Sequence, residues 1–138
     1  MKKVNLFCGI LFSLLILSSC SNDDESDNSN DIIIGKWRAI EKYESNVQVE
    51  IPVCLPYLYN EYKADKSIDG GKVITDDTPE ECGQVFTEFG WNWSNLGNNQ
   101  YRIRHLEEQG QVFTFYKDGV NLIKEYPDGI TKIILESY

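Results

Sequence analysis

The sequence has few of the residues on which several common functions depend. It contains one histidine, His105, in 138 residues, and no C-x-x-C pair. A histidine-based metal cage and two-histidine catalysis are therefore excluded, and a thioredoxin-like redox role has no support. Basic residues are also few, because 13 Lys and Arg stand against 22 Asp and Glu, giving a formal net charge of -9. This balance argues against binding nucleic acid or attaching to an anionic membrane surface by charge.

Long helices and long apolar runs are also missing. No stretch of ten or more residues has helical periodicity, and the longest apolar run, Leu6 to Leu17, falls short of the roughly 20 residues that span a bilayer. A positively charged pair, Lys2 and Lys3, precedes that run, and together they are typical of a secretory signal. The remaining length fits one domain, and a 41% hydrophobic content is enough for a packed core.

The apolar run ends in Leu17-Ser18-Ser19-Cys20. This segment resembles the lipobox of bacterial lipoproteins. The resemblance implies that residues 1–19 are a signal peptide and that Cys20 is lipidated as the first residue of the mature protein. Ser21, rather than Asp, then points to the outer membrane of a Gram-negative cell. The alternative is an ordinary signal peptide that is cut at another site and leaves Cys20 as a free thiol.

An acidic segment follows the lipobox. Five of the 11 residues from Ser21 to Asp31 are acidic, and none is basic or apolar. Such a segment cannot form a core, so we expect residues 20–31 to be a disordered tether and residues 32–138 to be the folded domain. The tether is similar to the acidic signals that send some bacterial lipoproteins to the cell surface. It is otherwise a plain spacer, with the domain facing the periplasm.

The folded domain contains two cysteines, Cys54 and Cys82. In an exported protein two such cysteines are expected to form a disulfide. The alternative is a pair of buried free thiols.

Short runs rich in β-branched and aromatic residues alternate with turn signals throughout the domain, including Asp69-Gly70-Gly71 and the stretch from Asn95 to Asn99. We expect one helical turn near residues 78–82, where Thr-Pro-Glu-Glu forms a capping-box pattern. Residues 46–56 favour an irregular loop, in which residues 48–51 are the alternative short strand. Strands are expected near residues 36–45, 57–63, 71–76, 84–93, 100–106, 111–117, 120–126 and 130–137. This pattern predicts an all-β domain, an eight-stranded antiparallel meander closed into a barrel.

The first strand begins with Gly35-Lys36-Trp37. A G-x-W motif before an eight-stranded meander resembles the lipocalin and calycin group. The whole chain is similar to small lipocalin-like lipoproteins of Gram-negative bacteria. The resemblance implies that Gly35 and Trp37 close one end of the barrel, with a basic residue from a late strand over the Trp ring. Lys132 is the expected basic residue.

Residues that could support catalysis or bind a metal are scattered. The pairs Asp76-Asp77 and Glu80-Glu81 favour a solvated acidic loop, with a Ca²⁺ site as the alternative. His105 favours a structural role, because the sequence has no G-x-S-x-G, H-E-x-x-H or P-loop motif. We therefore expect a non-enzymatic protein without a metal or cofactor.

Aromatic residues are the strongest indication of function. If they face inward, they line an apolar ligand pocket or, packed together, fill the barrel. The alternative for Trp91 and Trp93 is an exposed pair that contacts a protein or glycan. The sequence thus predicts a binding module for a small apolar or amphiphilic molecule, with a filled barrel whose loops contact a partner as the alternative. The expected ligand-binding residues are Trp91, Trp93, Tyr101, Phe113 and Phe115.

Overall fold

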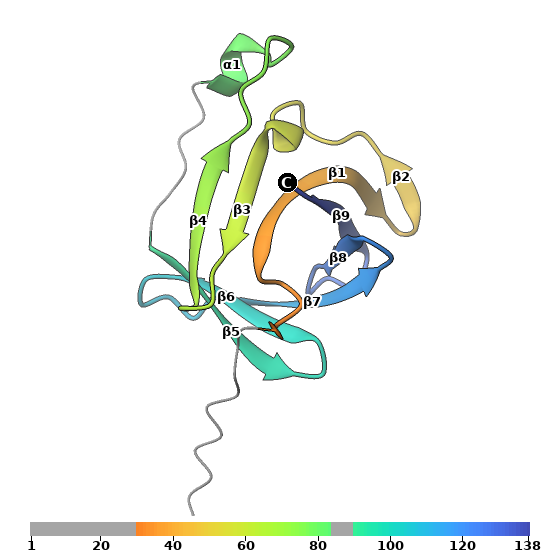
Figure 1. The fold of residues 1–138 in the computed structure, drawn as a ribbon. Helices are drawn as coiled ribbons and strands as arrows, with labels where there is room; N and C mark the ends of the chain where they lie inside the picture. Colours follow the sequence, from red (N-terminus) through yellow and green to blue (C-terminus); the bar gives the residue numbers. More distant parts are fainter. Residues whose placement is uncertain (1–29, 84–89) are drawn as a thin grey trace, which may run out of the picture.

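The fold is a closed antiparallel β-barrel, seen in a computed structural model that describes residues 30–83 and 90–138 (Figure 1). The described strands form one sheet in the order β2-β1-β3-β4-β5-β6-β7-β8-β9, and β1 also pairs with β9 to close it. The strands are β1 Gly35–Glu44, β2 Val47–Val49, β3 Leu58–Tyr62, β4 Ser67–Lys72, β5 Trp91–Gly97, β6 Gln100–His105, β7 Gln111–Asp118, β8 Asn121–Glu125 and β9 Thr131–Ser137. Eight strands make the barrel and β2 extends the end of β1, so the predicted closed meander is confirmed.

Alternating side chains explain why these segments become barrel strands. In β6, Tyr101 and Ile103 are buried while Arg102 and Arg104 are exposed. Strands β7 and β9 repeat the pattern, with buried residues at every second position. One face of each strand therefore enters the core and the other meets solvent, as a closed single-layer barrel requires.

The hairpin turns follow the local chemistry of the sequence. Strand β5 continues to Gly97, and the chain reverses at Asn98 and Asn99, whose φ angles are 51° and 61°. Two left-handed residues in succession match the twist of the flanking strands, and Asn tolerates that conformation. In the β8–β9 turn, Asp128 Oδ1 accepts hydrogen bonds from the backbone N–H groups of Ile130 and Thr131.

The predicted strand 71–76 is wrong, because the strand in this region is β4, Ser67–Lys72. The Asp69-Gly70-Gly71 sequence is not a turn, since all three residues pair with β3. Tyr59 lies directly opposite Gly71, and a Cβ at Gly71 would overlap the Tyr59 ring. The glycine therefore makes room for a cross-strand aromatic ring instead of breaking the strand.

Two further expectations need adjustment. The strand predicted at 84–93 is β5, which begins at Trp91, and residues 84–89 lie outside the described part of the chain. Within the predicted loop 46–56, residues Val47–Val49 form the short strand β2 against the end of β1. The signal peptide and the lipobox lie outside the described residues, as does the tether up to residue 29.

A disulfide joins Cys54 and Cys82, as predicted, with a Cα–Cα distance of 5.0 Å. Cys54 precedes the 3-10 helix η2, Leu55–Tyr57, and Cys82 lies in the short helix α1, Glu80–Gly83. The expected helical turn is thus present, although it begins at Glu80, one residue later than its capping pattern indicates. The disulfide ties the long β4–β5 connection to the segment before β3, at the upper end of the barrel in Figure 1.

The two ends of the barrel are built differently. At the end that we call the closed end, Ile33 is fully buried and its carbonyl accepts a 2.7 Å hydrogen bond from Trp37 Nε1. Asp31 also contacts this end, where it accepts hydrogen bonds from Tyr101 and Asn95. The opposite end, which we call the open end, carries the disulfide and the loops 50–54, 106–110 and 126–130. In the described residues, no helix has the length and apolar character needed to cross a membrane.

Candidate functional site: a cavity within the barrel

A cavity of about 590 Å³ occupies the interior between the closed end and the open end. Its wall comes from inward-facing positions on all eight barrel strands, and most of the side chains are apolar or aromatic. The floor and walls include Trp37, Ala39, Tyr62, Ile68, Ile103, Phe113, Lys124, Ile133 and Leu135, and the mouth includes Leu55, Leu58, Trp91, His105, Glu108, Gln111 and Tyr126. A volume of this size lies within the range of pockets that hold small molecules.

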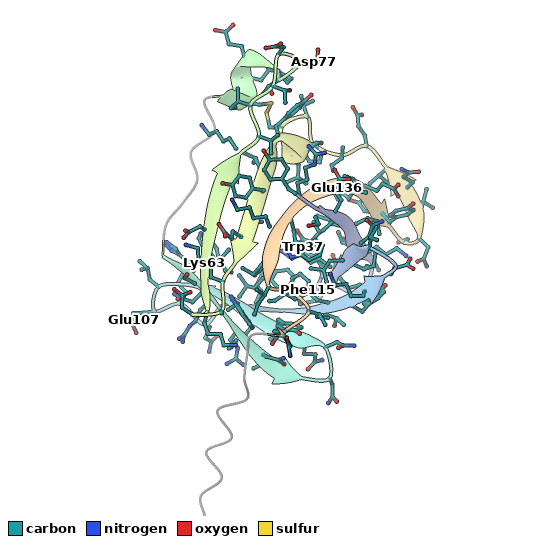
Figure 2. All side chains as sticks on the ribbon, viewed as in Figure 1. Trp37, Lys63, Asp77, Glu107, Phe115 and Glu136 are labelled. Carbon is teal, nitrogen blue, oxygen red and sulfur yellow. A yellow bond between two sulfur atoms is a disulfide. The ribbon has the colours of Figure 1, made fainter. Side chains whose placement is uncertain are left out.

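Aromatic side chains fill the closed end beneath this cavity. Trp93, Tyr101 and Phe115 are 2%, 3% and 0% exposed, and Figure 2 shows Phe115 within the ring of strands. The Tyr101 ring meets Phe115 edge-on at 5.4 Å and lies 6.0 Å from Trp93. This packing makes a solid base, so the barrel is filled at one end and hollow at the other.

The five predicted ligand-binding aromatics therefore divide into two groups. Trp91 and Phe113 line the cavity, whereas Trp93, Tyr101 and Phe115 belong to the packed base and are absent from its wall. The idea that the two tryptophans are an exposed pair is wrong, because Trp93 is 2% exposed and Trp91 faces the cavity. The alternative of a wholly filled barrel is also wrong, because the cavity occupies the interior above the packed base.

Two lysines cover the tryptophans of the closed end. Lys117 Nζ lies 3.9 Å from the centre of the Trp37 ring, and Lys66 Nζ lies 3.7 Å from that of Trp93. Lys66 Nζ is buried without a hydrogen-bond partner in the described residues, and desolvation lowers the pKa of both lysines. Attraction between a cation and an aromatic face offsets part of the cost of such burial.

The prediction that Lys132 covers Trp37 is wrong. Lys132 alternates with the inward residues Ile133 and Leu135, so it faces outward. It lies opposite Tyr43 in the β1–β9 ladder, with its Nζ 5.2 Å from the Tyr43 ring. The basic residue over the G-x-W tryptophan is Lys117, at the end of β7.

One positively charged side chain lies inside the cavity itself. Lys124 is in β8, where it alternates with the buried Leu122 on the inward face. Its Nζ lies 4.0 Å from the centre of the Phe113 ring and 5.2 Å from that of Tyr126. Desolvation lowers the pKa of Lys124 from 10.5 to about 8, with no carboxylate close enough to oppose the shift.

Two phenols provide further polar groups on the cavity wall. Burial raises the pKa of Tyr62 well above its ordinary value, and the neighbouring Tyr126 phenol adds to the shift. Burial also raises the pKa of Tyr126. Within residues 30–83 and 90–138, neither hydroxyl has a hydrogen-bond partner. Both phenols therefore stay protonated at neutral pH and can donate a hydrogen bond to a bound molecule.

The mouth of the cavity contains the single histidine. His105 lies directly opposite Trp91 in the β5–β6 ladder, and their ring centres are 5.0 Å apart. The acidic pairs Asp76-Asp77 and Glu80-Glu81 are exposed on the β4–β5 connection, and Figure 2 shows Asp77 far from the barrel interior. These four carboxylates are thus separated from the cavity, and none of them lines it.

Sequence reasoning missed Lys124, Tyr62 and Tyr126 as candidate site residues. The signal for Lys124 is its alternation with Leu122 in β8 and with Tyr126 just after that strand, which places the lysine on a face that carries apolar and aromatic residues. A lysine on a strand is normally exposed to solvent. The residue type therefore argued against an inward position for Lys124, although the alternation indicates one.

No protein-family profile and no curated protein matches this sequence. The fold and the cavity therefore carry the functional argument.

Proposed function

We propose that this protein is a non-enzymatic binding module whose barrel holds one small apolar or amphiphilic molecule. The observation that supports this proposal is the cavity of about 590 Å³, which has mainly apolar walls and a few polar groups. That combination is typical of ligand sites, because apolar surface supplies affinity and isolated polar groups set orientation.

We further propose that a lipid on Cys20 attaches the protein to the outer membrane, with the barrel displayed at the cell surface or facing the periplasm. The described chain joins the barrel at its closed end, where Asp31 is bonded to Tyr101. A tether that attaches there leaves the open end facing away from the attachment point. This arrangement keeps the mouth accessible to a ligand.

The cavity is tested with N-phenyl-1-naphthylamine, a neutral apolar dye whose fluorescence rises in apolar surroundings. We expect saturable binding to the chain from Ser21 to Tyr138, exported to an oxidising compartment. Leu58→Trp should weaken binding at least about tenfold, because it places a larger side chain at the mouth. Val120→Trp is the matched control, since Val120 is 85% exposed in the β7–β8 turn. Absence of dye binding, or equal loss in both variants, would contradict the proposal.

The lipid anchor is tested by fractionation of cells that produce the full chain. We expect the wild-type protein in the membrane fraction and Cys20→Ala in the soluble fraction, because the thiol is the attachment point for the lipid. A Cys54→Ala variant is the control, since it removes a cysteine without removing the anchor. Continued membrane attachment of Cys20→Ala would rule out anchoring through this residue.

A further inference from the structure

The position of Lys124 indicates which kind of molecule the cavity accepts. Lys124 lies in the middle of the barrel wall, opposite Phe115 on β7 and Ile133 on β9. Leu122, one inward position toward the closed end, is fully buried, and Tyr126, one position toward the open end, lies at the mouth. The ammonium group is therefore deep inside an apolar cavity, on its lining.

This ammonium has no anionic partner in the part of the chain that the structure describes. No described carboxylate forms an ion pair with Lys124, and its Nζ lies over the faces of Phe113, Phe115 and Tyr126. Glu108, the acidic residue at the mouth, is exposed in the β6–β7 loop. A buried charge without a counter-ion is costly, and aromatic faces offset only part of the cost.

The surroundings of Lys124 suit an anion with an apolar body. The phenols of Tyr62 and Tyr126 both line this cavity and have no hydrogen-bond partner among the described residues, so they are additional donors. The rest of the wall is mainly apolar from the floor at Ile68 to the mouth at Leu58. A ligand can thus bury an apolar chain along the wall while its charged end meets the ammonium.

We propose that the barrel binds an apolar monocarboxylate, with the carboxylate paired to Lys124 Nζ and the apolar chain extending along the wall toward the mouth. This inference rests on the proposed function, because it requires a ligand within the cavity. It goes further by naming the charge of the ligand and the residue that recognises it. The carboxylate supplies the counter-ion that Lys124 lacks among the described residues. The hydrogen bond between two charged groups is also stronger than one between neutral groups.

The test compares decanoate with decan-1-ol as competitors for the bound naphthylamine dye at pH 7. The alcohol has the same chain but no charge, and transfer out of water favours the alcohol over an ionised carboxylate. We expect decanoate to displace the dye at a concentration about tenfold lower than decan-1-ol, because a charge-assisted hydrogen bond contributes this much or more. Lys124→Met should remove this preference, which is read as the ratio of the two competitor concentrations within each variant. Lys132→Met is the matched control and should keep the dye binding and the preference of the wild type, since Lys132 faces outward.

The possible outcomes distinguish a failure of the monocarboxylate inference from a failure of the proposed function. Failure of the wild-type chain to bind the dye overturns both. Dye binding without a preference for decanoate overturns the monocarboxylate inference and leaves the binding module standing. A preference that survives in Lys124→Met also overturns it, because another group would then recognise the carboxylate. The wild-type comparison decides the matter even if Lys124→Met does not fold.

Discussion

Breaking the Cys54–Cys82 disulfide is expected to lower the free energy of unfolding by about 3 to 4 kcal/mol. The two cysteines are 28 residues apart, and the loop between them contains β3 and β4. Without the bond, the unfolded chain gains the conformational freedom of that loop, and the native state loses the link between α1 and the segment before β3. Urea unfolding of the oxidised protein and of the Cys54→Ala/Cys82→Ala double variant measures the difference.

The reducing agent needs a control of its own. Dithiothreitol should destabilise the wild-type protein by a similar amount and should leave the double variant unchanged, because that variant has no disulfide to reduce. Equal urea midpoints for the oxidised protein and the double variant would show that the bond adds nothing to stability.

Lys124→Met is expected to raise the free energy of unfolding of the ligand-free protein by about 3 kcal/mol at pH 7. Burial in the barrel lowers the pKa of Lys124 from 10.5 to about 8, so the native state disfavours the ammonium. Below pH 8 the lysine is charged in both states, and the native protein bears the full cost of desolvation. Methionine has a similar length and carries no charge, so it removes that cost.

The pH dependence of this effect identifies its cause. Between pH 8 and pH 10.5 the unfolded chain binds more protons at Lys124 than the native protein does. The stability contributed by this residue therefore rises with pH across that window, and the advantage of Lys124→Met should shrink by about 1.4 kcal/mol per pH unit. The other titratable groups of the cavity are Tyr59, Tyr62, His105, Glu108 and Tyr126, and they are common to both proteins.

The measurement is the difference in urea midpoint between the two proteins at several pH values from 7 to 10.5. Taking the difference cancels the titration of the shared groups, including the tyrosines. Lys132→Met is the control, because a lysine on the outer face should give a small difference with no such pH dependence. A constant difference across the range would contradict the assignment of the effect to the Lys124 ammonium.

The sequence was most informative where one physical rule decides the outcome. Alternation in β6 places Tyr101 and Ile103 inside the barrel, and the structure agrees. Alternation shows whether a side chain faces inward, but it contains no information on depth along the barrel axis. For this reason Phe113 and Phe115 share one face of β7, yet Phe113 lines the cavity and Phe115 belongs to the packed base.

The errors have equally specific causes. Gly70 and Gly71 indicate a turn by composition, but Gly71 accommodates the ring of Tyr59 from the neighbouring strand, a contact that only the β3–β4 register reveals. The residue over Trp37 depends on which hairpin ends near the closed end, and that residue is Lys117. Both outcomes depend on contacts between strands rather than on local sequence.

The most direct test of a ligand-holding barrel is native mass spectrometry of the chain from Ser21 to Tyr138, exported to an oxidising compartment and purified without detergent. We expect a defined additional mass that dissociates on activation, because a cavity of about 590 Å³ with apolar walls favours an occupant over water. The Leu58→Trp variant should lose that mass and Val120→Trp should keep it. A bare protein mass, unchanged after incubation with decanoate and with the naphthylamine dye, would contradict the account.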